Sequence, residues 1–120
     1  MLEPAYDDAR GVTAEFNRNL LRRVNRELGG DFDINRFSHR AAWNAEASRI
    51  ESYLVSVDRQ RVRVPAADLD VIFEAGEPIW TESSYKYRPE EVTTQLARAG
   101  FRAMEQWVSD GFALTLAEAT

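Results

Sequence analysis

Cysteine is absent from this 120-residue sequence, and histidine occurs once, as His39. Without cysteine the chain can form no disulfide bond, no thiolate metal site and no thiol nucleophile. A single histidine is a poor basis for a metal site, so we predict no metal ligands. His39 is then either a hydrogen-bonded structural residue or a catalytic base, and the composition favours the structural role.

Long apolar runs are also absent. No stretch approaches the ~20 apolar residues that a membrane span needs, and no hydrophobic signal region follows Met1. We therefore expect a cytoplasmic protein that does not cross a membrane.

Basic residues are outnumbered by acidic ones, 15 against 20, which gives a net charge of −5. This balance argues against nucleic acid or an anionic membrane as the main partner. The hydrophobic fraction is 44%, with 3 Trp, 4 Tyr and 6 Phe. That content indicates a folded chain with a modest core rather than a disordered one.

The first part of the chain predicts a helix followed by strands. Apolar residues at four-residue spacing predict a helix over residues 12–28 with one core-facing stripe: Val12, Phe16, Leu20, Val24 and Leu28, with Leu21 beside them. Thr13 is the expected N-cap, and Gly29–Gly30 supply the left-handed stop. The opposite face is basic and is either a solvated surface or a phosphate-binding patch, the acidic balance favouring the surface. It carries Arg18, Arg22, Arg23, Asn25 and Arg26.

Alternating residues predict an antiparallel sheet after this helix. A helical turn beginning at Asp33 leads into strands over residues 37–43, 49–57, 61–64, 69–73 and 80–87. Asp58–Gln60 is expected to close a hairpin between the second and third of these strands. The helix and the sheet together predict a compact α+β unit.

The last part of the chain predicts a second helix and a β-hairpin. Pro89 suits a first helical turn, and Gly100 ends that helix. Strands over 101–108 and 112–116 flank a tight turn at 109–111. We therefore expect an α+β chain with two parts, residues 1–87 and residues 88–120.

The segment Trp80–Tyr87 is the most informative part of the sequence. On a strand, alternate side chains share a face, so Trp80, Glu82, Ser84 and Lys86 are expected to point the same way. An apolar ring beside a carboxylate and a hydroxyl suits a flat ligand with N–H donors, such as an imidazole. A solvent-facing edge strand is the plainer alternative.

Motifs in order along nearly the whole chain resemble the histidine-specific, S-adenosylmethionine-dependent N-methyltransferases, which trimethylate the α-amine of histidine on the route to ergothioneine. The resemblance covers only the C-terminal part of the family's length. Its motifs are Ala5–Asp8, Gly11–Leu21, Asn25–Leu28, Asp31–Asp33, Phe37, His39, Trp43–Asn44, Arg49–Glu51, Ala75–Glu77, Thr81–Glu82, Ser84, Lys86, the helix that begins at Arg88–Glu90, and Ala99–Phe101.

The resemblance implies a substrate site on this chain. The residues that match Glu82 and Ser84 hydrogen-bond the imidazole of histidine. The residue that matches Tyr6 holds the substrate carboxylate, together with an asparagine that this chain lacks, and Thr13 and Phe16 match positions that line the same pocket. Tyr6 is otherwise a surface aromatic and Phe16 a core residue of the helix. Ser52 stands where relatives often have a larger apolar residue, so the exact amino-acid substrate stays open.

The resemblance also implies S-adenosylmethionine as cofactor, but the sequence lacks the turn that would hold it. The six glycines form no Gly-x-Gly cluster between a strand and a helix, which such a site needs. We therefore predict no cofactor-binding and no catalytic residue, and no methylation by this chain alone.

In the family, the second helix and hairpin resemble the C-terminal end of a class I methyltransferase sheet, so here the edge of that sheet would be bare. We expect it to pair with another chain, in a homo-oligomer or with a complementing cofactor-binding polypeptide. The alternatives to part of an enzyme are a non-catalytic binding or oligomerisation module, or one subunit of a split methyltransferase.

Overall fold

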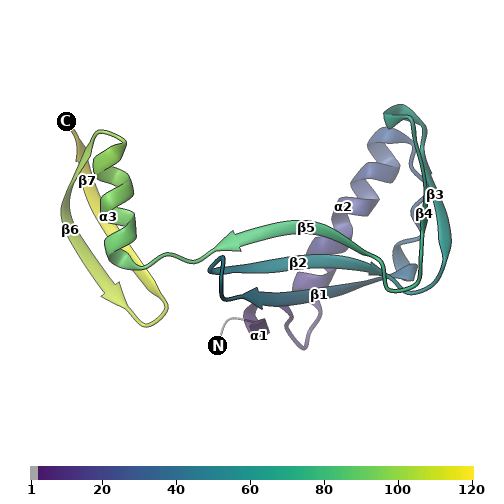
Figure 1. Cartoon of the computed structure of the whole chain (residues 1–120), viewed down its shortest axis with the longest axis horizontal. Helices are drawn as coiled ribbons and strands as arrows, with labels where there is room; N and C mark the ends of the chain where they lie inside the picture. Colours follow the sequence, from purple (N-terminus) through teal and green to yellow (C-terminus); the bar gives the residue numbers. More distant parts are fainter. Residues whose placement is uncertain (1–2) are drawn as a thin grey trace. The chain divides into compact units, whose positions relative to one another are not determined.

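A computed structural model of the chain describes residues 3–120, which divide into two compact units on either side of the Tyr85–Lys86 bond. The first unit contains the helices α1 (Glu3–Tyr6) and α2 (Val12–Leu28) and the strands β1 (Phe37–Asn44), β2 (Arg49–Ser56), β3 (Gln60–Val64), β4 (Leu69–Phe73) and β5 (Pro78–Tyr85), with short 3-10 turns η1 (Ile34–Arg36) and η2 (Pro65–Ala67). The second unit contains α3 (Pro89–Arg98), β6 (Phe101–Ser109) and β7 (Phe112–Ala119) (Figure 1). The predicted α+β class is confirmed.

In the first unit, α2 packs on an antiparallel three-stranded sheet of order β1-β2-β5. The α2 boundaries are those that the apolar spacing predicts, and Gly29 ends the helix at φ 66°. The prediction of Thr13 as the N-cap is wrong, because Gly11 takes that position. The Asp8 carboxylate accepts a hydrogen bond from the Thr13 backbone N–H at 3.0 Å. Asp8 precedes the helix, so its side chain can reach the free N–H groups of the first turn.

The strands β3 and β4 form a sheet of their own. The predicted hairpin between residues 49–57 and 61–64 is therefore wrong, because β2 pairs with β5 instead. At the end of β2 the Ser56 hydroxyl donates to the Asp58 carbonyl and accepts from the buried Gln60 amide. These bonds hold a bend at Val57–Asp58 after which the chain leaves the first sheet.

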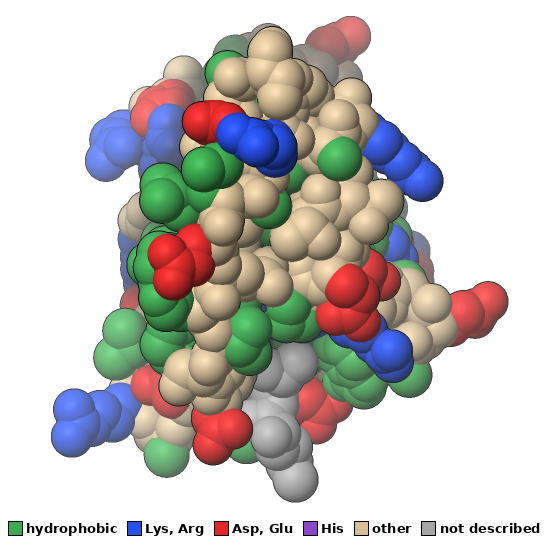
Figure 2. Space-filling model, turned by 90° about the vertical axis from the view of Figure 1, so that its left-hand side faces the viewer, with side chains coloured by type: hydrophobic (Ala, Val, Ile, Leu, Met, Phe, Trp, Pro, Cys, Tyr) green, Lys and Arg blue, Asp and Glu red, His purple; other side chains and the backbone are tan. Residues whose placement is uncertain are grey.

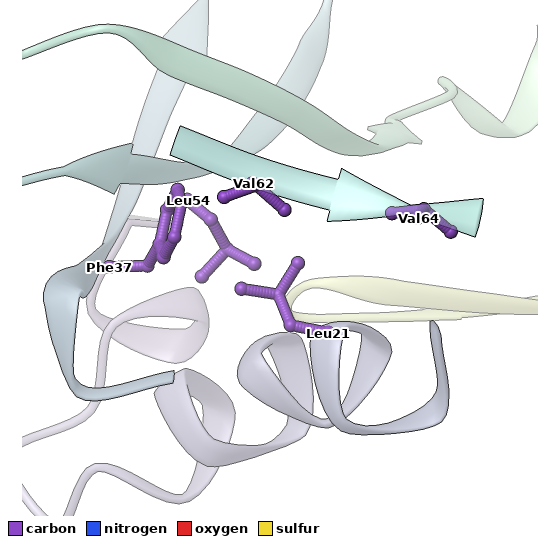
Figure 3. Close-up of a cluster of buried hydrophobic side chains, with 5 residues drawn as sticks. All are labelled: Leu21, Phe37, Leu54, Val62 and Val64. Atoms are coloured by element: carbon purple, nitrogen blue, oxygen red, sulfur yellow. The ribbon is translucent and has the colours of Figure 1, made fainter. Parts of the chain in front are cut away.

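The core of the first unit lies between α2, the three-stranded sheet and the β3–β4 pair. Figure 3 shows five of its side chains converging from these elements: Leu21, Phe37, Leu54, Val62 and Val64. Burial of each such side chain contributes about 1.5–3 kcal/mol to folding. The predicted core stripe of α2 is wrong for four of its five residues, because Val12, Phe16, Leu20 and Leu28 are 65%, 74%, 44% and 40% exposed. The buried face is turned instead toward Asn17 and Leu21.

The basic face of α2 is a solvated surface with internal ion pairs. Arg18 and Arg22 both contact the Glu15 carboxylate, and Arg23 and Arg26 contact Glu27. Because these ion pairs neutralise the arginine charges within the helix, they favour a solvated surface over a phosphate-binding patch.

In the second unit, α3 packs on one antiparallel hairpin, β6–β7. Gly111 makes its tight turn at φ 86°, and Pro89 begins α3, as the sequence predicts. Hydrophobic side chains remain on the surface, as Figure 2 shows for the face that it presents; those of the hairpin include Trp107, Phe112, Leu114 and Leu116. No helix within residues 3–120 has the length and apolar character to cross a membrane.

Candidate functional site

A pocket of about 270 Å³ lies between α2 and β5, within the first unit. It is an open cleft walled by apolar side chains of the helix and by polar groups of the strand. Its lining residues are Phe16, Asn17, Asn19, Leu20, Arg23, Thr81 and Glu82. The exposed Phe16 therefore forms a wall of this pocket rather than part of the core.

A β-bulge in β5 determines which side chains face the pocket. Tyr53 of β2 pairs with Trp80, and the next residue back, Ser52, pairs with Glu82, so Thr81 is an extra residue. Its hydroxyl donates to the Ser52 carbonyl at 3.0 Å. A bulge of this kind interrupts the alternation of side chains. Both Thr81 and Glu82 consequently line the cleft.

The bulge corrects the predicted face of residues 80–87. Trp80 lies on the opposite face of the sheet from Glu82, because paired residues share a face and Tyr53 and Ser52 are neighbours on β2. The Trp80 ring contacts the Tyr53 ring, with centroids 6.3 Å apart. Lys86 lies beyond the strand, which ends at Tyr85. Glu82 and Ser84 remain on one face.

Ser84 lies two residues beyond Glu82 on the regular part of β5, where it pairs with the buried Ile50. Two residues along a strand span about 6.6 Å. A carboxylate and a hydroxyl at this spacing suit a ring with a polar atom on each side. Ser84 Oγ is hydrogen-bonded to Tyr6 Oη at 2.9 Å, so the α1 segment reaches this strand.

His39 connects this Tyr6 segment to the helix. Its Nε2 lies 2.7 Å from the Tyr6 carbonyl oxygen, and its Nδ1 lies 2.9 Å from Nδ2 of Asn17. Asn17 also donates to the Tyr53 carbonyl at 3.2 Å. The expectation of a hydrogen-bonded structural histidine agrees with this arrangement.

Five sequence-predicted residues are thus distributed over one side of the sheet. Glu82 and Phe16 line the pocket, and Tyr6 and Ser84 are bonded to each other. Thr13 lies in the first turn of α2 with its N–H held by Asp8, and it is not among the residues that line the pocket. The sequence reasoning missed five of the pocket residues: Asn17, Asn19, Leu20, Arg23 and Thr81. Residues 16, 19, 20 and 23 share one helix face, so their spacing could have revealed Asn19, Leu20 and Arg23 as walls of the pocket.

The opposite face of the sheet carries a second polar cluster that the sequence reasoning also missed. The Glu51 carboxylate, 9% exposed, accepts from Tyr53 Oη and from Arg49 Nε, each at 2.7 Å. The Arg49 guanidinium lies 4.6 Å from the centroid of the Trp80 ring. The bond from Tyr53 and the ion pair with Arg49 lower the pKa of Glu51, and the Glu51 carboxylate raises the pKa of Tyr53. These contacts tie β2 to β5 across the bulge.

Residues 3–120 lack the glycine turn that holds S-adenosylmethionine in a doubly wound fold. The strand pairs of this part of the chain are antiparallel, so no glycine turn joins a parallel strand to a helix. The glycines with positive φ lie at helix ends and turns instead. The same residues include no group of three acidic or histidine side chains placed to hold a metal ion.

Comparison with known proteins supplies the family. The family described as histidine-specific, SAM-dependent methyltransferase matches residues 1–119. The chain is 53% identical over 115 residues to the histidine N-alpha-methyltransferase of Mycolicibacterium smegmatis and 51% identical to that of Mycobacterium tuberculosis. Each match covers 94% of this chain and 36% of the relative, so the chain spans little more than a third of their length. The chain belongs to the histidine-specific, SAM-dependent methyltransferase family.

Proposed function

We propose that this chain supplies the histidine-recognising part of an S-adenosylmethionine-dependent histidine N-α-methyltransferase. The observation that carries the proposal is the pair Glu82 and Ser84 on one face of β5, beside a pocket walled by Phe16. The Glu82 carboxylate accepts an imidazole N–H, and the Ser84 hydroxyl bonds the other ring nitrogen. The ring itself lies against Phe16.

This arrangement selects histidine through the hydrogen bonds that Glu82 and Ser84 make to the two ring nitrogens. A site built for hydrogen bonds rejects an analogue that leaves those bonds unmade, in favourable cases by about 10⁴-fold. Tyr6 holds Ser84 in place and contributes its phenol to the carboxylate end of the substrate. We assign Thr13, at the start of α2, to the same end of the site on the family resemblance alone, since it does not line the cleft. The product of such an enzyme is a precursor of ergothioneine.

The chain does not methylate histidine by itself in this account. Residues 3–120 do not fit the cofactor, so the cofactor-binding part is supplied by another polypeptide segment. The enzyme acts in the cytoplasm, and the split-enzyme alternative differs only in whether that segment is a separate subunit.

The β6–β7 hairpin supports the need for a partner. Within the described chain its two strands pair only with each other, so each has one open edge. Leu114 and Phe112 are 63% and 68% exposed. Open edges and exposed apolar side chains are the features that a further strand covers. We propose that the cofactor-binding segment, or a second copy of the chain, pairs here.

A reconstitution assay tests the proposed function. The chain is mixed with the segment of the M. smegmatis relative that it does not cover, and methyl transfer to histidine is measured by mass spectrometry. We expect transfer from the mixture and none from either part alone. Transfer by this chain alone, or tight binding of S-adenosylmethionine to it in calorimetry, would contradict the proposal. A folded mixture that binds no histidine would favour the non-catalytic module.

A further inference from the structure

The segment before α2 is held to the sheet by polar contacts rather than by a core. The helix α1 has no buried residue. Its contacts with the sheet include the Glu3 carboxylate, which accepts from the Trp43 backbone N–H at 3.0 Å, and the Tyr6 carbonyl, which contacts His39. Hydrogen bonds to β1 therefore help to fix the position of Tyr6.

The partners of His39 determine its tautomer. A carbonyl oxygen only accepts, so Nε2 of His39 donates its hydrogen to the Tyr6 carbonyl. An amide nitrogen only donates, so Nδ1 accepts from Asn17. The second N–H of Asn17 donates to the Tyr53 carbonyl, which fixes which end of the Asn17 amide faces His39. These two bonds fit the tautomer of His39 that has its hydrogen on Nε2.

The two ends of this connection differ in rigidity. Asn17 is 9% exposed and lies on the buried face of α2, and His39 pairs across the sheet with Leu54, which is fully buried. The other end is the Tyr6 carbonyl, which belongs to α1, a helix with no buried residue. The rigid core therefore places Tyr6 through His39, and the Tyr6 phenol contacts Ser84.

We propose that His39 is a positioning residue of the histidine site: it holds the Tyr6 segment so that the Tyr6 phenol orients Ser84 toward the bound imidazole. This inference rests on the proposed function for its ligand. His39 touches neither substrate nor cofactor, and its effect is transmitted through Tyr6.

The first test needs no enzymatic activity. His39 is the only histidine, so its ring nitrogens give unambiguous ¹⁵N signals in the isolated chain. We expect a neutral ring with Nε2 protonated and Nδ1 bare at neutral pH. In His39→Leu the amide hydrogens of residues 3–13 exchange faster than in the wild type. In His39→Gln they keep wild-type protection, because the amide nitrogen donates to Tyr6 and its oxygen accepts from Asn17. A ring with hydrogen on Nδ1, or unchanged exchange in His39→Leu, would overturn the proposal.

The second test uses the reconstituted enzyme. We expect His39→Leu to raise KM for histidine about three- to tenfold, the effect of one lost hydrogen bond. The KM for S-adenosylmethionine and kcat stay within about twofold, and His39→Gln restores KM for histidine. Tyr6→Phe raises the same KM, and the double variant His39→Leu/Tyr6→Phe is no worse than Tyr6→Phe alone, because His39 acts through the Tyr6 phenol.

The outcomes separate this proposal from the proposed function. An inactive wild-type mixture together with the expected tautomer and exchange would count against the function alone. An active mixture in which His39→Leu leaves KM for histidine unchanged would overturn the role of His39. Equal changes in both KM values would show a general structural defect and would overturn it as well.

Discussion

The two units of this chain are built from the same kinds of element and differ in what those elements bury. In the first unit Phe37 and Leu54 are 1% and 0% exposed, inside a cluster drawn from a helix and two sheets. In the second unit, residues 86–120, no side chain reaches that degree of burial. A two-stranded hairpin is marginal in water by itself, and the packing of α3 on this one leaves Trp107 and Phe112 exposed. The comparison teaches that the candidate recognition site is built on a unit with its own core, whereas the apolar residues of the hairpin stay exposed in the second unit.

The largest expected effect is on the core of the first unit. Leu54→Ala removes a fully buried side chain, so we expect the free energy of unfolding to fall by about 2–5 kcal/mol. Urea denaturation followed by tryptophan fluorescence measures the change through Trp43 and Trp80. A loss below about 1 kcal/mol would show that this core does not stabilise the unit.

Hydrogen exchange tests the difference between the units directly. We expect the amides of β2 to exchange about a hundredfold or more slowly than those of β7, because only the former lie over a closed core. Adding the segment of the M. smegmatis relative that this chain does not cover should slow exchange in β7 and leave β2 unchanged. Equal protection of the two strands in the isolated chain would contradict the proposed difference in stability between the two units.

Lowering the pH is expected to reduce stability by a smaller amount, and this loss should be confined to the first unit. The pKa of Glu51 is lowered in the folded chain, so its ionised form stabilises that state above the ordinary glutamate pKa. This contribution is lost as the pH falls from the ordinary glutamate pKa through the lowered one. We expect the Tm of the wild type to fall more steeply over this range than the Tm of Glu51→Gln. Parallel curves would show that the Glu51 cluster contributes nothing.

The smallest effect is expected in the hairpin. Leu114 is 63% exposed, so Leu114→Ala should change the free energy of unfolding of the isolated chain by no more than about 0.5 kcal/mol. The same substitution should weaken association with the complementing segment, measured by calorimetry. A large loss of stability without the partner would show that the hairpin buries Leu114 unaided.

The sequence predicts local structure well and tertiary pairing less well. Helix α2 follows from apolar spacing and from Gly29, both of which are local signals. The strand that pairs with β2 could not be predicted locally, because the choice of β5 over β3 depends on a bend held by Ser56 and Gln60. The exposure of Phe16 could not be predicted from the sequence for a related reason. Periodicity shows that a helix face is apolar but not which element covers it.

The candidate site shows the same division. The sequence places Glu82 and Ser84 on one strand face two residues apart, and the pairing of β5 with β2 agrees. Trp80 is assigned to the wrong face because a bulge at Thr81 leaves no mark in the alternation of residues. The link from His39 to Tyr6 joins segments 33 residues apart and has no local signal.

Substrate selectivity of the reconstituted enzyme tests the central claim, that Glu82 recognises the imidazole of histidine. The quantity is the ratio of kcat/KM for histidine to kcat/KM for phenylalanine, measured for the wild type, for Glu82→Ala and for Glu74→Ala. Glu74 is the matched control, an exposed carboxylate in an ion pair with Arg59 outside the pocket. We expect Glu82→Ala to lower the ratio by about 10²-fold or more, since the imidazole N–H loses its acceptor, and Glu74→Ala to leave it unchanged. A ratio that Glu82→Ala leaves at the wild-type value would contradict the assignment of this pocket as the histidine site.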